Sequence, residues 1–371
     1  MQHAKLSPSS SARWLSCTGS VKAEQSFPSS TTSYAVEGTT AHALAELCLT
    51  TNDHPTKYIG QTLEGHIVDE DMVEHIAAYC AYVKSYSGVH LYEHRFSLTK
   101  WIPDSFGTSD AVVIDEANGT AHIIDLKYGK GVSVEAEQNT QAMLYALGVI
   151  DDLGFMYEFD TVVIHIYQPR IKNYSSWQTS TKYLLEWAEW VSQRAKETQL
   201  PDAPRTPSEK ACQWCKAKAT CKALLDHTHN VIMNDFDDLT SINPDTLTDN
   251  ELRVVMDNAK LIKSWLDAVE AHIFDKLNNG QVFDGYKLVE GRSTRTWQDE
   301  QQAAILLADK VPSDKLFTQK LISPAQAEKL LKNDKALFAS LVTKSTGKPT
   351  LVPSCDKRIA LNDANVFDSL D

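Results

Sequence analysis

The 371-residue sequence lacks any apolar run of about eighteen residues, the length that a membrane-spanning helix needs. Its first residues, MQHAKLSPSSSARW, contain no apolar core of a secretory signal, so we expect a cytoplasmic protein. Basic residues are also in deficit, because 36 Lys and Arg face 49 Asp and Glu and the formal net charge is −13. This balance argues against a nucleic-acid partner unless basic side chains cluster locally.

Such a cluster exists in one segment. Between residues 205 and 222 a single acid, Glu209, accompanies five basic residues: Arg205, Lys210, Lys216, Lys218 and Lys222. We expect Lys210, Lys216, Lys218 and Lys222 to contact a DNA backbone.

Cysteines are few and unevenly placed. The chain has seven, and three of them (Cys212, Cys215 and Cys221) lie within ten residues. A disulfide framework is not expected in a reducing cytosol, and the clustering indicates metal binding instead. We interpret Cys48 and Cys80 as buried helical residues and Cys355 as part of a tail.

The hydrophobic pattern predicts an α/β fold with a mixed central sheet flanked by helices. Asn118-Gly119 indicates a tight hairpin between two of the strands. The predicted helices cover 35–49 (from about Gly38), 70–87, 134–150 and 183–199, and the predicted strands cover 90–98, 107–115, 120–129 and 161–170.

The pattern changes after about residue 225, and we place a domain boundary at 225–245. Thr248 and Glu251 form a capping box for a long helix that ends at Asn279-Gly280. A hairpin over 282–297 and two shorter helices, the last from Ser323-Pro324, complete this part. The prediction is a core at 1–225 and a mainly helical accessory region at 226–371.

Two carboxylates and a lysine form the candidate catalytic set. Asp110 follows Gly107, and Asp125-Leu126-Lys127 ends the next predicted strand. The i, i+2 spacing on a strand turns Asp125 and Lys127 to one face and Leu126 to the core. Phosphodiester hydrolysis needs a cation that neutralises charge and activates water, and carboxylates are the ligands that Mg²⁺ prefers. Alone, Asp-x-Lys is more often a surface ion pair.

A wider set of residues recurs in a consistent order around this pair. His42 lies on the first helix, Glu93 on the first strand, and Gln141 and Tyr145 share one face of the helix that follows. Taken singly, each has an ordinary structural interpretation: His42 as a surface histidine, Glu93 as an ion-pair partner of Arg95 or of a nearby lysine, Gln141 and Tyr145 as helix surface.

In this order the motifs resemble the RecB-like branch of the PD-(D/E)xK nuclease superfamily. The resemblance covers about residues 1–225 and implies a restriction-endonuclease-like core. It implies metal ligands at His42, Asp110 and Asp125 and at the backbone oxygen of Leu126, with Mg²⁺ or Mn²⁺ as the ion. Lys127 would orient or deprotonate the attacking water or stabilise charge, and Gln141 and Tyr145 would position the site or contact DNA.

The three clustered cysteines need a fourth ligand. From the residues alone, His227 or His229 could complete a local zinc site. The resemblance implies instead that Cys17 joins Cys212, Cys215 and Cys221 around a [4Fe-4S] cluster, although Cys17-Thr18 departs from the family's Cys-Pro. Such a cluster would close a long loop and stabilise the fold by about 4–5 kcal/mol. Zn²⁺ remains the alternative.

The segments LSPSSSARWLSC, EGTTAH and GKPTLVP resemble a phage- or prophage-encoded group within this branch. The resemblance implies a DNA exonuclease for recombination or replication in a bacterial host cell, beside a phage single-strand-binding or annealing protein. The alternatives are a non-catalytic DNA-binding or recombination-scaffold protein that keeps the fold, and a zinc-stabilised RNA-processing nuclease.

Overall fold

The structure is a computed structural model with two compact units, Met1–Trp265 and Leu266–Asp371. It describes residues 4–28, 33–234, 249–291, 293, 295–318, 320–324, 326–327, 335–344, 349–353 and 359–361. In the described residues no helix is long and apolar enough to cross a membrane.

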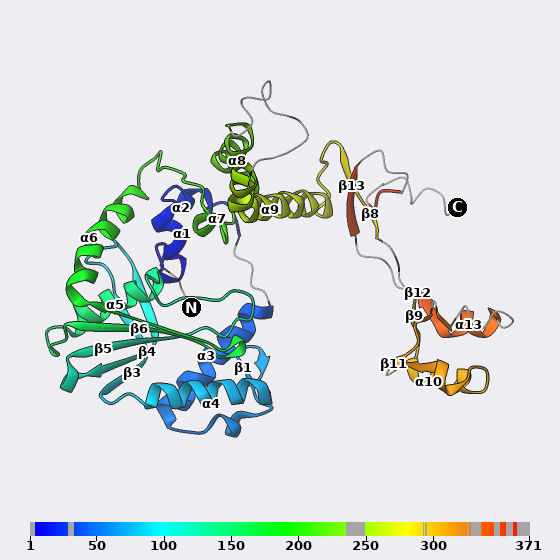
Figure 1. Cartoon of the computed structure of the whole chain (residues 1–371), viewed down its shortest axis with the longest axis horizontal. Coiled ribbons are helices and arrows are strands. Elements are labelled where there is room, and N and C mark those ends of the chain that lie inside the picture. Colours follow the sequence, from blue (N-terminus) through cyan, green and yellow to red (C-terminus); the bar gives the residue numbers. More distant parts are fainter. Residues whose placement is uncertain are drawn as a thin grey trace. The chain divides into compact units, whose positions relative to one another are not determined.

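A five-stranded mixed sheet is the centre of the first unit (Figure 1). Its spatial order follows the chain, β3-β4-β5-β6-β7, and β5 and β6 are parallel while the other neighbours are antiparallel. Parallel neighbours need a crossover, which a helix between them supplies. The strands are β3 (Val89–Ser97), β4 (Phe106–Asp115), β5 (Thr120–Leu126), β6 (Thr161–Gln168) and β7 (Asn173–Ser180).

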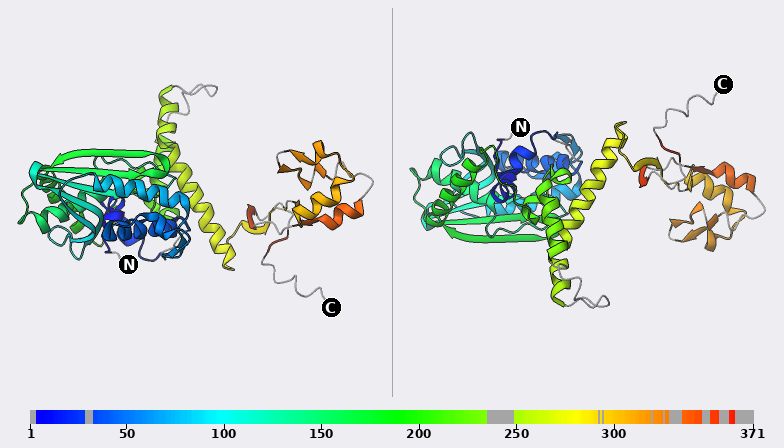
Figure 2. Two further views of the ribbon diagram at one scale, coloured as in Figure 1. Left: turned by 90° about the horizontal axis from the view of Figure 1, so that it is seen from below. Right: turned by 90° about the horizontal axis from the view of Figure 1, so that it is seen from above.

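Helices cover both faces of this sheet (Figures 1 and 2). One core joins α3 and α4 to alternate residues of the strands, among them Ala111, Ile124 and Leu126. The opposite core joins α1, α5 and α6 to the intervening residues, such as Val112 and Ile123. The helices are α1 (Ser11–Ser16), α2 (Ser20–Ala23), α3 (Ser33–Thr51), α4 (Glu70–Lys84), α5 (Thr140–Leu153), α6 (Thr181–Glu197), α7 (Glu209–Cys212) and α8 (Lys222–Asn234).

Side-chain caps explain where three of these helices begin. Asp69 accepts from the N–H of Met72 at the start of α4, and Ser180 from that of Tyr183 at the start of α6. Asn139 accepts from the N–H of Ala142 at the start of α5. Each cap satisfies an N–H group that a helix terminus leaves without an intrahelical partner.

Short elements complete the first unit. The turn between β1 (Thr62–Leu63) and β2 (His66–Ile67) has Gly65 at a φ of +87°. The 3-10 helices are η1 (Pro8–Ser10), η2 (Pro55–Tyr58), η3 (Glu116–Asn118), η4 (Pro169–Ile171) and η5 (Lys218–Thr220).

The expected class is confirmed: a mixed α/β fold with a central mixed sheet flanked by helices and a mainly helical C-terminal region. The hairpin at Asn118-Gly119 is also confirmed, with Gly119 at a φ of +55°. Three details were wrong. The first helix begins at Ser33 rather than near Gly38, α5 begins at Thr140 rather than at residue 134, and β7 was not predicted. The strand β7 (NYSSWQTS) is a polar edge strand, so it lacks the apolar alternation that signals a half-buried strand.

The second unit has its own small core, built around Leu307, Val311, Ile322 and Leu341. The predicted hairpin over 282–297 is wrong, because β8 pairs with β13 and β9 with β12. Thr248 of the predicted capping box and Cys355 lie outside the described residues. The elements from the end of the first unit onward are α9 (Asp249–Asn278), β8 (Tyr286–Glu290), β9 (Arg295–Trp297), α10 (Glu300–Ala308), α11 (Ser313–Leu316), β10 (Phe317–Thr318), β11 (Lys320–Leu321), α13 (Lys335–Leu341), β12 (Val342–Lys344) and β13 (Pro349–Pro353).

Candidate metal centre and cysteine pocket

Asp110 joins two neighbouring strands through its carboxylate. On β4 it lies one residue before Ala111, which pairs with Ile124 of β5. Its Oδ2 accepts a 2.6 Å hydrogen bond from the N–H of Leu126, the last residue of β5. The aspartate is therefore held at the point where the ladder between the two strands ends.

His42 reaches the same carboxylate from α3. Its Nδ1 lies 3.2 Å from Oδ1 of Asp110 and 3.9 Å from Oε1 of Glu93. The imidazole is one-third exposed, with 34% of its side-chain surface accessible. Two carboxylates thus face one imidazole nitrogen at a position that solvent can reach.

Glu93 belongs to this group because of strand register. Tyr92 pairs with Ala111 and His94 with Ser109, which places Glu93 across from Asp110. Its backbone has a φ of +42°, a strained conformation for a non-glycine residue and one that is enriched at functional sites.

Glu93 is not among the ligands expected from the sequence, and Arg95, the partner expected there, instead stacks on the ring of Phe106. Antiparallel pairing of the two predicted strands was the signal that could have identified it.

Lys127 begins a chain of polar contacts that leads to α5. Its Nζ lies 2.9 Å from Oδ2 of Asp125 and donates a 2.9 Å hydrogen bond to Oε1 of Gln141. Gln141 Nε2 in turn donates to the hydroxyl of Tyr145 at 2.8 Å. Although Lys127 Nζ is close, Oδ2 of Asp125 is buried without a partner of hydrogen-bonding geometry. The ammonium of Lys127 is the cation that faces this buried oxygen.

The carboxylates and the imidazole shift one another's pKa. Burial lowers the pKa of His42, but the charge of Asp110 and a hydrogen bond to it, with smaller contributions from Asp125 and Glu93, raise it to about 9. Burial and the neighbouring charge of Asp110 raise the pKa of Glu93 to about 7. Negative charge is therefore concentrated around His42.

The pKa values of Asp110 and Asp125 shift in opposite directions from that of a free aspartate. Burial raises the pKa of Asp110, but the His42 charge, the hydrogen bonds and Lys127 hold it below its ordinary value. Burial raises the pKa of Asp125, and Lys127 offsets only part of that increase. Burial lowers the pKa of Lys127, but the charges of Asp125 and Asp110 raise it above its ordinary value, so the ammonium stays charged.

The donor set fits one divalent cation. Ligand atoms of His42, Glu93 and Asp110 all lie within 4.8 Å of one another. Octahedral Mg²⁺ with bonds of about 2.0–2.1 Å separates its ligand atoms by about 3 to 4 Å, which matches this span. Carboxylates suit Mg²⁺ and Mn²⁺, and an imidazole suits the transition metal better.

The six predicted residues His42, Asp110, Asp125, Lys127, Gln141 and Tyr145 thus come together at one end of the sheet. Leu126 lies between Asp125 and Lys127 with its side chain buried against α3 and α4, as expected. A metal-binding role for its carbonyl oxygen, like the catalytic roles of the other residues, stays a prediction.

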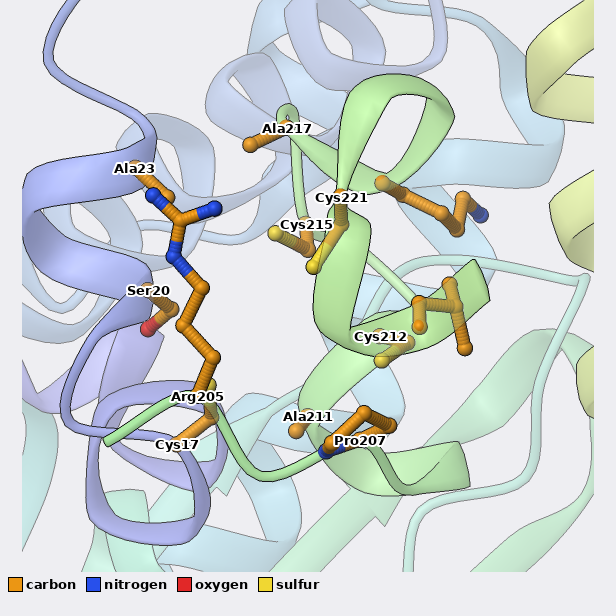
Figure 3. A pocket seen from close by; sticks show the side chains of 12 residues that line it. Cys17, Ser20, Ala23, Arg205, Pro207, Ala211, Cys212, Cys215, Ala217 and Cys221 are labelled. Atoms are coloured by element: carbon orange, nitrogen blue, oxygen red, sulfur yellow. The ribbon is translucent and has the colours of Figure 1, made fainter. Parts of the chain in front are cut away.

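The four predicted cluster cysteines lie elsewhere and line a common pocket (Figure 3). Cys17 comes from the end of α1, and Cys212, Cys215 and Cys221 come from the segment opposite it. Neither His227 nor His229 lines this pocket. Burial raises the pKa of the thiols of Cys17, Cys212 and Cys215, that of Cys215 to about 12.

Hydrogen bonds hold the N-terminal segment against this pocket without any metal. The N–H of Thr206 donates to Sγ of Cys17 at 3.3 Å, and Nη1 of Arg13 donates to the carbonyl of Trp214 at 3.3 Å. Glu24 also accepts from the N–H of Lys216 at 2.7 Å, and Lys22 donates to the carbonyl of residue 200 at 2.7 Å. Residues some 178 to 201 positions apart in sequence are joined in this way.

The predicted DNA-contacting lysines are in different environments. Lys210, Lys216 and Lys222 are exposed, and Lys222 pairs with Asp226 at 2.6 Å. Lys218 is half-buried and donates to Ser264 Oγ on α9 at 2.7 Å. Its ammonium therefore fastens α9 to the cysteine segment, and its role toward DNA stays a prediction.

The fold and site define a mixed α/β protein with a candidate His-Glu-Asp metal centre at one end of its sheet. The chain belongs to the family described as "Protein of unknown function (DUF2800)", whose profile matches residues 3–359. A solved structure described as "Crystal structure of SSO0001" matches 60% of this chain and 88% of its own, at 10% identity and a TM-score of 0.28. A likeness at that score carries no argument about function.

Proposed function

We propose that this protein is a Mg²⁺- or Mn²⁺-dependent deoxyribonuclease that degrades DNA from its ends. One observation carries the proposal: a His-Glu-Asp group that can hold a cation lies beside a buried Asp125-Lys127 ion pair. That combination supplies the cation site that phosphodiester hydrolysis needs and places a fixed positive charge beside it.

His42, Glu93, Asp110 and Asp125 would hold the ion. The chemistry supplied by such an ion when bound is charge neutralisation at the phosphate and a lower pKa for a coordinated water. Because Asp125 keeps the ammonium of Lys127 charged, Lys127 stabilises negative charge on the phosphate rather than accepting a proton. Gln141 fixes the direction of that ammonium, and Tyr145 fixes Gln141.

The proposal includes a [4Fe-4S] cluster held by Cys17, Cys212, Cys215 and Cys221. One observation supports Cys17 as the fourth ligand over His227 or His229: all four cysteines line one pocket, and neither histidine lines it. The biological setting inferred from the motifs is phage or prophage recombination or replication, with a single-strand-binding or annealing protein as partner.

The decisive experiment compares Asp125→Ala with Glu116→Ala on end-labelled linear DNA with Mn²⁺. Asp125 is buried in the site, whereas Glu116 is an exposed acid in the same β4–β5 hairpin. We expect cleavage by the Asp125 variant to fall about 10³-fold and cleavage by the Glu116 variant to be unchanged.

Equal activity of the Asp125 variant and the wild type would show that the site is assigned wrongly. A wild-type protein that binds DNA but cleaves none would favour the non-catalytic scaffold, and cleavage of RNA alone would favour the RNA-processing alternative. Equal rates on linear and covalently closed circular DNA would contradict digestion from the ends.

A further inference from the structure

The segment between β5 and α5 connects the two halves of the candidate catalytic set. Lys127 lies at its start and Gln141 just after its end, and their side chains are hydrogen-bonded at 2.9 Å. Residues 127–139 form no helix or strand. Side-chain contacts from outside the segment must therefore determine its path.

Gln168, the last residue of β6, makes three of those contacts, and all three fall on residues 129–134. Its side chain is 2% exposed, and Nε2 donates 2.9 Å hydrogen bonds to the carbonyls of Gly129 and Val132. Its Oε1 accepts from the N–H of Val134 at 3.2 Å and from Nδ2 of Asn173 at 3.1 Å. Both amide hydrogens and both lone pairs of the oxygen are used, so Gln168 is fully satisfied.

These bonds dictate which groups the segment shows to solvent. The structure has no cis peptide bond in its described residues, and in a planar trans peptide the C=O and N–H point in opposite directions. Because the carbonyls of Gly129 and Val132 turn inward to Gln168, the N–H groups of the next residues, Lys130 and Ser133, turn outward.

The outward face has the chemistry of an anion contact. Lys130 is exposed beside these N–H groups, and a Cβ built on Gly129 or Gly131 would meet no atom within 4 Å. Outward backbone N–H groups next to a lysine bind phosphate in other proteins. Lys127 is only two residues before Gly129.

We propose that residues 129–134, here named the Lys130 loop, contact a phosphate of the DNA strand beside the reacting one, and that Gln168 is the positioning residue that shapes the loop. This inference rests on the proposed nuclease function. The loop would be preorganised, so DNA binding would not lose free energy to the conformational entropy of ordering it.

The first arm of the test measures loop order. Gln168→Met keeps a similar volume and removes every hydrogen bond of the amide, while Gln168→Glu keeps the acceptor and removes both donors. The matched control is Gln178→Met, at an exposed position on β7. We expect amide hydrogen exchange in the Lys130 loop to rise in both Gln168 variants and to stay unchanged in the control. Unchanged exchange in Gln168→Met would overturn the positioning role.

The second arm measures the phosphate contact with a short labelled DNA duplex in Ca²⁺, over a series of salt concentrations. Lys130→Gln should lower the slope of log K against log salt by about one. Gln168→Met should weaken binding about tenfold. Lys182→Gln, which changes an exposed lysine on α6, should leave both quantities unchanged.

The outcomes separate this inference from the function on which it rests. A Lys130→Gln variant with the wild-type slope would overturn the phosphate contact while leaving the nuclease proposal intact. A wild-type protein that neither binds nor cleaves DNA would overturn the proposed function and the phosphate contact together. Hydrogen exchange would still decide whether Gln168 holds the loop.

Discussion

The candidate metal centre and the cysteine pocket are assembled by different means. Strand register and a helix bring the carboxylates, the imidazole and the lysine together within residues 42–145, and the opposing Glu93 and Asp110 lie on paired strands. The cysteine pocket instead joins Cys17 to a segment about two hundred residues later, through hydrogen bonds such as Thr206 N–H to Cys17 Sγ. The first site depends on the sheet, and the second depends on long-range closure of the chain.

Because the two sites are assembled differently, substitutions in each should have different effects. Changes to the metal centre should remove chemistry and leave the architecture intact, because the surrounding strands remain paired. Changes to the cysteine pocket should remove its metal first, and the protein contacts around Arg13, Glu24 and Lys22 should then keep the N-terminal segment in place. Four predictions test the contrast.

The largest effect is expected at Lys127. Lys127→Met removes the positive charge beside Asp125, so we expect the cleavage rate to fall about 10²- to 10³-fold. Mn²⁺ should still bind, because His42, Glu93 and Asp110 remain, and iron content should be unchanged. Single-turnover cleavage, Mn²⁺ titration and iron analysis measure the three quantities. Loss of iron in this variant would show that the two sites are not independent.

Acid should destabilise the protein through a buried histidine of the sheet, which lies apart from both sites. His165 on β6 is 4% exposed, and its ring nitrogens are hydrogen-bonded to Tyr82 and His122. Burial lowers the pKa of His165 to about 4. In the unfolded chain His165 is protonated below about pH 6.5, whereas in the folded chain it stays neutral down to about pH 4. Its contribution to the free energy of unfolding is therefore fully present above pH 6.5 and is lost as the pH falls toward 4. The loss is about 3 kcal/mol at the lower end.

Urea denaturation across this pH range measures the loss. His165→Phe should reduce the change in the free energy of unfolding with pH. His229→Gln, which changes an exposed histidine on α8, should leave that pH dependence as in the wild type. The same slope in His165→Phe and in the wild type would contradict the assignment.

Cys17→Ser should have a smaller effect on stability than on metal content. We expect iron to be lost and the free energy of unfolding to fall by about 2 kcal/mol, less than the 4–5 kcal/mol of closing a long free loop. The reason is that Arg13 and Lys22 donate hydrogen bonds to the carbonyls of Trp214 and Leu200, and Glu24 accepts one from the N–H of Lys216. Cys48→Ser, in the core between α3 and α4, is the control and should keep its iron.

Metal analysis and limited proteolysis of the N-terminal segment measure these effects. Rapid cleavage of that segment in Cys17→Ser would mean that the cluster, not the protein, fastens it. Zinc at one per chain in both wild type and variant would show that Cys17 is not a ligand.

The smallest effect is expected at the start of α5. Asn139→Ala removes the cap bond to the N–H of Ala142 and should lower the free energy of unfolding by about 1 kcal/mol. Glu137→Ala, two residues earlier and exposed, is the control. Because α5 carries Gln141 and Tyr145, cleavage should fall modestly while iron content stays constant. A loss of iron would link this helix to the cysteine pocket.

Some of these features follow from the sequence alone. Apolar periodicity and Asn118-Gly119 were enough to predict the central strands, the β4–β5 hairpin and the placement of Asp125 and Lys127 on one face. Strand geometry is local, so the i, i+2 spacing determines the face wherever the strand lies. The order of His42, Asp110, Asp125 and Gln141 along the chain likewise predicts a joint site.

Only the tertiary structure could decide the rest. Glu93 becomes a candidate ligand because pairing places it opposite Asp110, and pairing register depends on contacts between strands rather than on either strand alone. The edge strand β7 and the path of the segment before α5, with its carbonyls turned to Gln168, depend on partners distant in sequence, which no local pattern encodes. The sequence determined which residues could carry the chemistry. Long-range packing decided which of them meet.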